Sequence, residues 1–460
     1  MRLQLEAIIN AVQGKVLNPE ALKKFESAVI EEVTTDSRKE VHQGLFIPLK
    51  GEHFDGHHFI SMVFDKGAVA TLTMEEVVED PRLVTILVQD TKKALLDLGC
   101  FYRKQFNIPV VGITGSVGKT STKEMIAAVL SGKWQMHKTE GNFNNEIGLP
   151  LTLFKLEEGH EAAIIEMGMN HFGEIHNLSC CALPDVGVIT NIGTSHIENL
   201  GSRAGILKAK LEILDGLNPE GLLIVNGDND LLGSLSELPI HKMTYGLQSS
   251  NDYWAEAIQS EGEYTKATIH SPHKTYTIRI HALGEHMIYN TLAAIVVAEH
   301  YHLSEVEIQN GLESYIPAKM RMHISKLENG ITVIDDTYNA SPESMKAALK
   351  VLKDYETKGK KIAILGDMFE MGEFAPMLHQ EVGAFASELG IDELIAVGEL
   401  ARHLYEGCQE KELCKAYYFE TKELFMTHLL EYIHKGDCVL LKASRGMHFE
   451  TLVEEVRKVK

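Results

Sequence analysis

The sequence predicts an α/β protein of three domains, two of which have mostly parallel sheets. At 460 residues the chain is too long for a single hydrophobic core. Short apolar runs alternate with helical patterns from residue 108 to about 317, and the alternation restarts after Pro317. The breaks at Asn107-Ile108-Pro109 and at Pro317 therefore predict domains over residues 1–107, 108–317 and 318–460.

The first segment mixes short strands with helices. The apolar runs LFIPL (45–49) and VTILV (84–88) predict two strands. The segment ends in TKKALLDLGCFYRKQF (91–106), whose apolar spacing is that of a helix.

The central segment has the pattern of a parallel sheet. Its apolar runs are each followed by a helical or loop stretch, as expected of strands buried on both faces. The predicted strands are 108–114, 162–167, 186–192 and 222–226. Residues 252–282 alternate with period two instead, which predicts an antiparallel excursion within or beside that sheet.

The last segment, of about 140 residues, predicts a Rossmann-like doubly wound domain, because strand and helix patterns alternate again. The predicted strands are 331–335, 361–366, 393–398, 414–419 and 438–442.

Composition excludes several classes of partner. Lys and Arg number 44 against 65 Asp and Glu, a net charge of −21, which argues against binding to nucleic acid or to an anionic membrane. No apolar run approaches bilayer length, and the N-terminus lacks the pattern of a signal peptide. The six cysteines form no C-x-x-C pair and suit a reducing compartment. We expect a cytoplasmic protein.

A phosphate-binding loop follows the first strand of the central segment. The stretch GITGSVGKTST (112–122) places Gly115, Gly118, Lys119 and Thr120 between a strand and a helix. In such a loop backbone N–H groups and the lysine hold phosphates, and the Ser/Thr hydroxyl binds Mg²⁺. The usual first glycine would fall at Ile113, so the spacing is not standard, but strand, turn and helix are all present. These residues predict an ATP or GTP site with Mg²⁺.

Three further residues are ambiguous when taken alone. Glu166 ends a strand, where ligands collect at the carboxyl edge of a parallel sheet, and it suits either Mg²⁺ or an ion pair. His196, one of 22 histidines, lies in a loop after another strand and is by itself more typical of an ordinary core or surface histidine. Lys210 has the pattern of a solvated helix face.

Motifs along nearly the whole chain resemble those of the Mur ligases, ATP-dependent amide-forming enzymes of peptidoglycan synthesis. The most specific are DDTYNASP (335–342) and GDMFEMGE (366–373). Supporting stretches include TTDSR, GLFIPLKGEHFDGHHF, TGSVGKTSTKE, GNFNNEIGLPLTL, IIEMGMNHFGEI, TNIGTSHIENLGS, AKLEIL, GEHMIYNTLAA and LKASRGMHFE.

The resemblance implies a role for each domain. The first would bind the UDP of a precursor through Ser37, Arg38, Asp55, Gly56 and His57. The nucleotide would be held by Thr114, Gly115, Ser116, Val117, Gly118, Lys119, Thr120, Ser121, Asn290, Arg321, Asp336 and Tyr338.

The resemblance also implies two Mg²⁺ sites and a substrate channel. Thr120 and Glu166 would bind the Mg²⁺ of the nucleotide, and His196 a second Mg²⁺. Lys210 would be the lysine that some of these ligases carry as a carbamate, beside that second metal. Asn144 and Asn145 would line the substrate channel. Catalysis would depend on Lys119, His196, Lys210 and Arg321.

Within the family the motifs favour ligation of D-alanyl-D-alanine to UDP-N-acetylmuramoyl-tripeptide through an acyl phosphate. Members that add diaminopimelate carry an Asp-Asn-Pro-Arg run, which is absent from this sequence. Two alternatives stay open: another carboxylate–amine ligase, and a binding protein that uses nucleotide hydrolysis as a switch. The third residue of the peptide, lysine or diaminopimelate, is not predicted. We expect a monomer.

Overall fold

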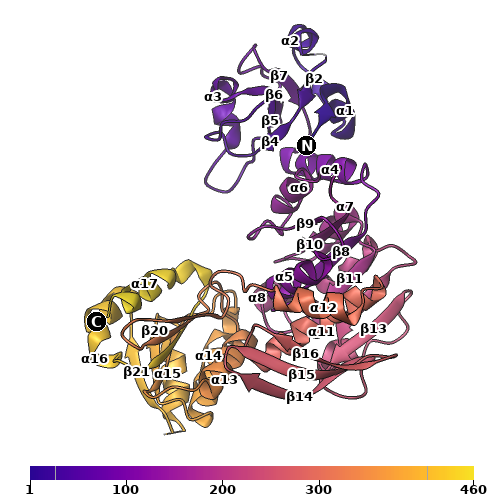
Figure 1. Ribbon diagram of the computed structural model, residues 1–460. Helices are drawn as coiled ribbons and strands as arrows, with labels where there is room; N and C mark the ends of the chain where they lie inside the picture. The colour runs from indigo at the N-terminus through magenta and orange to yellow at the C-terminus, as the bar shows by residue number, and fades with distance from the viewer. Residues whose placement is uncertain (26, 412, 460) are drawn as a thin grey trace.

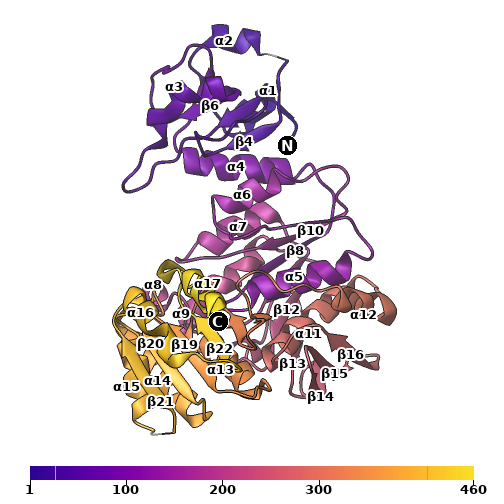
Figure 2. The same ribbon diagram turned by 60° about the vertical axis from the view of Figure 1, so that its left-hand side comes forward.

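The computed structural model describes residues 1–25, 27–411 and 413–459, which form three bodies (Figure 1). The N-terminal body stands apart at one end and touches the central body through α4 (Thr91–Arg103). The C-terminal body lies against the opposite side of the central body, as the second view also shows (Figure 2).

The N-terminal body contains, in its described part, a five-stranded sheet of order β2-β7-β6-β5-β4. Strands β4 to β7 run parallel, and β2 pairs with β7 antiparallel. The bounds are β2 Lys15–Val16, β4 Glu32–Thr34, β5 Gly44–Phe46, β6 Ala68–Thr73 and β7 Val84–Leu87. A small pair joins β1 (Leu3–Gln4) to β3 (Val29–Ile30), and the helices are α1 (Leu5–Ala11), α2 (Pro19–Lys24) and α3 (Ile60–Val63).

The central body contains a nine-stranded sheet of order β16-β15-β14-β13-β12-β11-β8-β10-β9, all of whose residues are described. Strands β8 to β14 are parallel, and β15 and β16 add antiparallel at one edge. The strand bounds are β8 Val110–Thr114, β9 Met136–Lys138, β10 Ala162–Glu166, β11 Val186–Ile189, β12 Leu222–Asn226, β13 His241–Gly246, β14 Tyr253–Glu261, β15 Tyr264–His270 and β16 Thr275–Ile280.

Helices cover both faces of this sheet, because successive residues of its strands point to opposite sides. Val111 and Ile113 of β8 belong to the core under α5 and α11, whereas Val110 belongs to the core shared with α4, α6 and α7. The helix bounds are α5 Lys119–Leu130, α6 Gly148–Leu153, α7 Glu174–Ala182, α8 Ile197–Leu200, α9 Arg203–Leu211, α10 Asp230–Gly233, α11 Glu285–His300 and α12 Glu305–Glu313.

The C-terminal body has, in its described part, a six-stranded sheet of order β17-β18-β22-β19-β20-β21, parallel except for the edge strand β17. The strands are β17 His323–Lys326, β18 Thr332–Asp335, β19 Lys361–Gly366, β20 Glu393–Val397, β21 Lys415–Phe419 and β22 Cys438–Lys442. Helices α13 (Pro342–Asp354), α14 (Ala375–Glu388) and α15 (Arg402–Gln409) cover one face, and α16 (Lys422–Tyr432) and α17 (Glu450–Lys458) the other.

The predicted α/β class is confirmed, and so are the parallel sheets and the antiparallel excursion over 252–282. Strands β6, β9, β13 and β17 were not predicted, and neither were the short strands β1 to β4. Helix α4 was assigned to the first segment, yet it packs on α6 and α7 of the central body as well as on α1. No helix in the described residues is long and apolar enough to span a bilayer.

Candidate active site

The phosphate loop connects β8 to α5 at the middle of the central sheet, between β10 and β11. Gly115 (φ +149°) and Gly118 (φ +86°) adopt backbone conformations that L side chains rarely take. A Cβ at Gly115 would lie 1.9 Å from Thr190 Oγ1. The loop therefore needs glycine at both positions, and it brings backbone N–H groups to the N-terminus of α5, where anions bind.

Residues after β11 hold the loop in place. Ser116 N donates to the Asn191 carbonyl (3.0 Å), and Val117 N donates to Asn191 Oδ1 (2.9 Å). Lys119 Nζ donates to the Gly115 carbonyl (2.7 Å), so its side chain curls over the loop. Burial lowers the pKa of Lys119, with the cation of Arg321 acting in the same direction and Glu166 opposing both.

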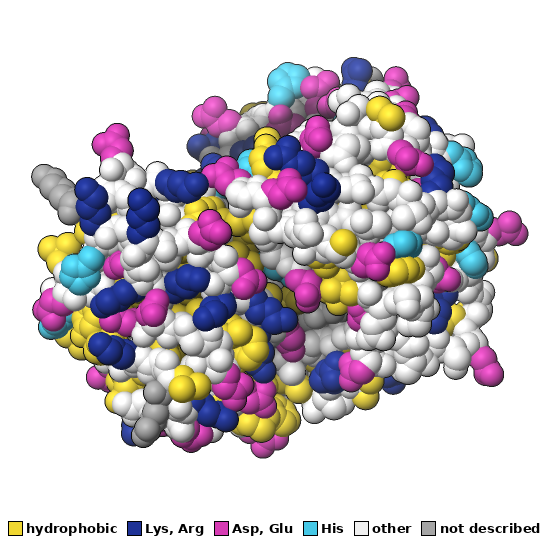
Figure 3. Space-filling model, turned by 60° about the horizontal axis from the view of Figure 1, so that its bottom comes forward, with side chains coloured by type: hydrophobic (Ala, Val, Ile, Leu, Met, Phe, Trp, Pro, Cys, Tyr) yellow, Lys and Arg dark blue, Asp and Glu magenta, His cyan; other side chains and the backbone are white. Residues whose placement is uncertain are grey.

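A cavity of about 290 Å³ lies between this loop and the C-terminal domain. Its walls include residues 116–121, Asn290 of α11, and Arg321 and Asp336 from the C-terminal domain. A pocket bordered by a phosphate loop on one side and by apolar and polar groups on the other suits a nucleotide. Figure 3 shows the two domains meeting along a seam, with the C-terminal domain on the left.

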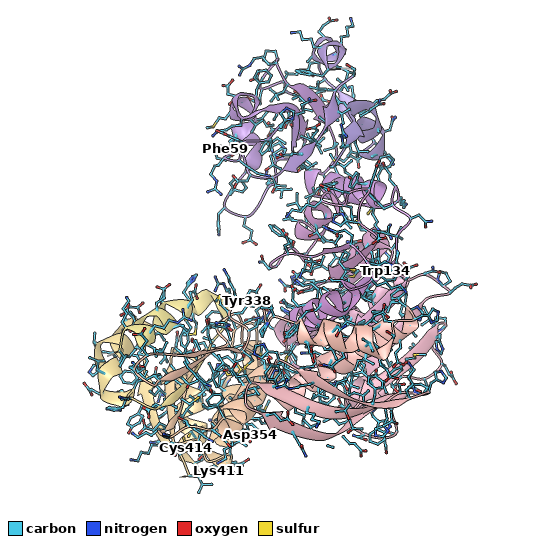
Figure 4. The ribbon with its side chains drawn as sticks, in the orientation of Figure 1. Phe59, Trp134, Tyr338, Asp354, Lys411 and Cys414 are labelled. Atoms are coloured by element: carbon cyan, nitrogen blue, oxygen red, sulfur yellow. The ribbon has the colours of Figure 1, made fainter. Side chains whose placement is uncertain are left out.

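A second cavity of about 310 Å³ adjoins the first. It is lined by Asn144, Asn145, Glu166, His196 and Tyr338, among other residues. Lys119 and Arg321 line both cavities. In Figure 4 Tyr338 lies at the edge of the C-terminal domain that faces the central domain.

Glu166 is buried at the end of β10 with one carboxylate oxygen available. Its Oε1 accepts from Asn144 Nδ2 (2.8 Å), while Oε2 has no hydrogen-bond partner among the described residues. Lys123 Nζ stands 3.8 Å from Oε2. Mg²⁺ is usually held by one or two carboxylates together with substrate phosphates, so a buried carboxylate with an open oxygen beside a phosphate loop fits that ion. Thr120 lines the neighbouring cavity.

His196 begins α8, and its Nδ1 lies 2.5 Å from Oε2 of Glu370 in the C-terminal domain. The neighbouring His196 ring lowers the pKa of Glu370. No cluster of three or more His, Cys, Asp or Glu side chains suited to a metal ion exists within the described residues. A metal here would take its other ligands from water, from substrate or from a modified side chain.

Lys210 lies on α9, where it is 1% exposed, instead of on the solvated face that its pattern alone suggested. The described residues offer it no carboxylate within 4.0 Å. Burial sets the pKa of this amine well below its ordinary value, and the nearby cation of Lys119 lowers the pKa further. A neutral buried amine can react with CO₂, so the environment fits a carbamate.

The C-terminal domain supplies ionic groups to the wall of the first cavity. Asp336 is buried and pairs with Lys442 (2.5 Å), while its Oδ1 accepts from Met322 N (3.1 Å). The Arg321 guanidinium lies over the Tyr338 ring, 4.1 Å from its centroid. Sequence reasoning did not assign Lys442, which borders the cavity, or Lys123. Lys123 lies one helical turn after Lys119, a spacing that places both on one face of α5.

The residues predicted for UDP gather in the N-terminal domain, away from both cavities. Ser37 and Arg38 follow β4, and Asp55, Gly56 and His57 follow β5, so they lie at one edge of a parallel sheet. Arg38 pairs with Asp36 (2.8 Å). His57 is buried, with its Nδ1 2.6 Å from Asp55 Oδ1 and its Nε2 accepting from Met74 N.

Comparison with known proteins identifies this arrangement. Residues 113–298 match the Mur ligase middle domain, and residues 320–445 match the Mur ligase glutamate ligase domain. The chain is 42% identical to the UDP-N-acetylmuramoyl-tripeptide–D-alanyl-D-alanine ligase of Bacillus subtilis, over 98% of this chain and 97% of that one. It belongs to the Mur ligase family.

Another relative of this Mur ligase is the UDP-N-acetylmuramoyl-tripeptide–D-alanyl-D-alanine ligase of Escherichia coli, 34% identical over 93% of this chain and 94% of that one. A MurF crystal structure from Acinetobacter baumannii superposes with a TM-score of 0.92 at 31% identity, covering 100% and 99% of the two chains. The structure of a Thermotoga maritima MurF in complex with ADP superposes with a TM-score of 0.83 at 28% identity, covering 93% of this chain and 97% of that one. The predicted family, fold class and enzyme class are thereby confirmed: the chain is a ligase.

Proposed function

We propose that this Mur ligase joins the amine of D-alanyl-D-alanine to the terminal carboxylate of UDP-N-acetylmuramoyl-tripeptide, with cleavage of ATP to ADP and phosphate. The product is the pentapeptide precursor of peptidoglycan, made in the cytoplasm, a setting that suits the six free thiols. Relatives with this activity in their names match nearly end to end. The observation that carries the proposal is that Lys119 and Arg321 border both cavities.

A shared border suits a reaction in which phosphate must pass from one ligand to another. A carboxylate is a poor electrophile, so its oxygen first attacks the γ-phosphorus to give an acyl phosphate and ADP. The dipeptide amine then attacks the acyl carbon, and phosphate leaves from a tetrahedral intermediate. Lys119 and Arg321, at the border, would neutralise the charge where the two anions meet.

The cations we propose are two Mg²⁺ ions, which would neutralise phosphate charge when bound. Thr120 and Glu166 would hold the one on the nucleotide, as the open Glu166 Oε2 supports. His196 and a carbamate on Lys210 would hold the other, as the buried, uncompensated lysine supports. Reaction of the neutral Lys210 amine with CO₂, with release of a proton, would give an anionic ligand for this metal.

The other predicted residues take the roles that their positions support. Asn290 and Asp336 would contact the nucleotide from the two sides of the first cavity, and Asn144 and Asn145 would line the peptide channel. Tyr338 would set the orientation of Arg321 from beneath its guanidinium. We assign UDP to the loops after β4 and β5, with Ser37, Arg38, Asp55, Gly56 and His57.

The test is release of ADP and phosphate by purified protein with ATP and Mg²⁺. UDP-N-acetylmuramoyl-tripeptide is present throughout, in lysine and diaminopimelate forms, and D-alanyl-D-alanine is added or withheld. We expect turnover only with both substrates and a UDP-pentapeptide by mass spectrometry. Equal turnover without the dipeptide would contradict the proposal and favour a nucleotide-driven switch. Turnover with free diaminopimelate or lysine as the amine would favour another ligase of the superfamily.

A further inference from the structure

The loop of residues 190–196 connects the phosphate loop to the C-terminal domain. On one side its Asn191 accepts hydrogen bonds from Ser116 N and Val117 N, and Gly193 N donates to Ser116 Oγ (3.0 Å). On the other side Thr194 donates to a carboxylate that belongs to the C-terminal domain, Glu343. The loop is thus bonded to both parts of the nucleotide site.

Glu343 is the second residue of α13 and borders the nucleotide cavity. Its Oε1 accepts two hydrogen bonds, from Thr194 N (2.8 Å) and from Thr194 Oγ1 (3.0 Å). Hydrogen bonds to a charged acceptor are roughly twice as strong as those between neutral groups. A carboxylate in the first turn of a helix is also favoured by the helix dipole. The contact is therefore well suited to holding the two domains together.

Gly193 leaves the space that this contact needs. A Cβ at that position would lie 2.7 Å from both Cδ and Oε1 of Glu343, well inside van der Waals contact. Glu343 Oε2 is buried and has no hydrogen-bond partner among the described residues. The carboxylate therefore packs directly on the Gly193 backbone, and any side chain there would displace it.

We propose that Glu343 is a positioning residue that couples docking of the C-terminal domain to the geometry of the phosphate loop. When the domain docks, Glu343 fixes Thr194. The loop of residues 190–196, which contains Thr194, in turn fixes Ser116 and Val117 of the phosphate loop. Docking also brings Arg321 to the border between the two cavities. Docking therefore places Arg321 at the border and, at the same time, holds the phosphate loop in the conformation that these hydrogen bonds fix.

The role deepens the proposed ligation and rests on it. If the domain undocks after the acyl phosphate has formed, water reaches that intermediate and ATP is consumed without amide formation. The contact predicts tight coupling of the two steps, with one amide made for each ADP released. A residue that only stabilised the fold would lower the active fraction and leave that ratio at one.

The experiment compares Glu343→Ala and Glu343→Gln with the unaltered chain. We expect Glu343→Ala to shift the docking equilibrium on the order of tenfold, which raises the KM for ATP and lowers the amide-to-ADP ratio below one. Glu343→Gln keeps an oxygen that accepts both bonds and should restore the ratio. The matched control is Glu285→Ala, because Glu285 of α11 stands 4.0 Å from Lys350 of α13 in an exposed contact between the same domains. That variant should behave like the unaltered chain.

Gly193→Ala offers a second route to the same outcome without touching the carboxylate. It should reproduce the effects of Glu343→Ala, and the double variant should be no worse than either single one. A ratio of one in Glu343→Ala, or a Glu343→Gln variant as uncoupled as Glu343→Ala, would overturn the proposal.

Failure of the proposed function would be recognised separately, because the unaltered chain would then make no pentapeptide. Glu343 is still tested in that case by calorimetric binding of ADP. About tenfold weaker binding in Glu343→Ala, with unchanged binding in Glu343→Gln, would support the positioning role. Equal binding in all three proteins would contradict it.

Discussion

At the residue scale, the ion pair between Asp336 and Lys442 shows how the nucleotide site depends on buried charge. Both side chains are more than 90% buried, and Lys442 Nζ also donates to the Asn339 carbonyl (2.9 Å). Desolvation lowers the pKa of Lys442, and the carboxylate of Asp336 raises it again. The pair therefore fixes the position of the Asp336 carboxylate on the cavity wall.

Lys442→Met should leave that carboxylate buried without its cation. We expect a loss of about 3–5 kcal/mol in the free energy of unfolding, because one partner of a buried pair has been removed. The KM for ATP should also rise. Chemical denaturation and ATP kinetics measure the two effects. The double variant Asp336→Asn/Lys442→Met should recover most of the stability but not the affinity for ATP, and a double variant as unstable as the single one would contradict this account.

Lys210→Ala tests the proposed carbamate. It removes the buried amine, so ligation should be lost, and a small carboxylate such as acetate in the buffer should restore part of the activity by taking the place of the carbamate. Activity is measured as amide formed against acetate concentration. Lys208→Ala, one residue before Ala209 on the same helix and near the Phe172 ring, is the control and should need no rescue. Loss of activity in Lys210→Ala that no small anion restores would argue for a lysine that acts as a cation.

At the scale of elements, His379 of α14 fixes the loop that follows β19. The ring is fully buried, and its Nε2 accepts from Met368 N (2.9 Å) while Nδ1 donates to the Ala375 carbonyl (2.6 Å). Burial lowers its pKa from 6.5 to about 4. The same loop carries Glu370, the partner of His196, so this neutral histidine supports the domain contact.

The lowered pKa predicts a loss of stability in mild acid. Between pH 6.5 and 4 the His379 ring binds a proton in the unfolded chain but not in the folded chain. The stability contributed by His379 is therefore present above pH 6.5 and falls as the pH drops towards 4. The limit is about 1.4 kcal/mol per pH unit, or roughly 3 kcal/mol over the window. His379→Gln carries no titrating group, so its Tm should fall less than that of the unaltered chain between pH 7 and pH 4.5, by calorimetry. His434→Gln, at a mostly exposed histidine of the same domain, should not flatten the curve.

The most apolar strands of the central sheet were predictable because the pattern that indicates them is local in the sequence. Apolar runs buried on both faces gave β8, β10, β11 and β12 to within a few residues. Strand β9, with the sequence MHK, has only three residues and little apolar character, and its place at the sheet edge depends on pairing with β10. Helix α4 was predicted as a helix, but its packing on α6 and α7 is a tertiary property that its own sequence does not encode.

The candidate site likewise has parts that the sequence predicts and parts that depend on tertiary contacts. The phosphate loop was visible from spacing, because its glycines and lysine are contiguous. Glu343 was not visible, since a glutamate after a proline at a helix start is an ordinary first-turn residue. Its function depends on Thr194, which is 149 residues away in the sequence. The burial of Lys210 was likewise hidden, because α9 carries charged residues on more than one face.

At the scale of the whole molecule, the nucleotide cavity exists only where two domains meet. Its phosphate side belongs to the central domain, and Arg321 and Asp336 belong to the C-terminal domain. Arg321 Nε is buried and has no hydrogen-bond partner among the described residues, although its guanidinium rests on Tyr338. The arginine is thus held ready for an anion that arrives between the domains.

Arg321→Ala should lower kcat on the order of 10²-fold or more, because an arginine beside a transferring phosphoryl group stabilises charge in the transition state. Stability should change little, since the side chain is only partly buried. Steady-state kinetics with ATP and both peptide substrates give the measurement. Arg402→Ala, at an exposed arginine of the same domain, is the control. A variant with raised KM and unchanged kcat would place Arg321 in binding alone.

Binding of nucleotide and precursor should also make the molecule more compact. The two ligands would bridge groups of opposite charge across the seam, with Lys119 on the central domain and Arg321 on the C-terminal domain facing the same phosphate. Closure of this kind keeps water from the acyl phosphate. Small-angle X-ray scattering with a non-hydrolysable ATP analogue and UDP-N-acetylmuramoyl-tripeptide should show a smaller radius of gyration than the free protein. Lys119→Ala, which weakens the hold on the phosphates, should abolish the change. An unchanged radius in the unaltered chain with both ligands bound would mean that the C-terminal domain is docked before they arrive, and that its position does not respond to the nucleotide.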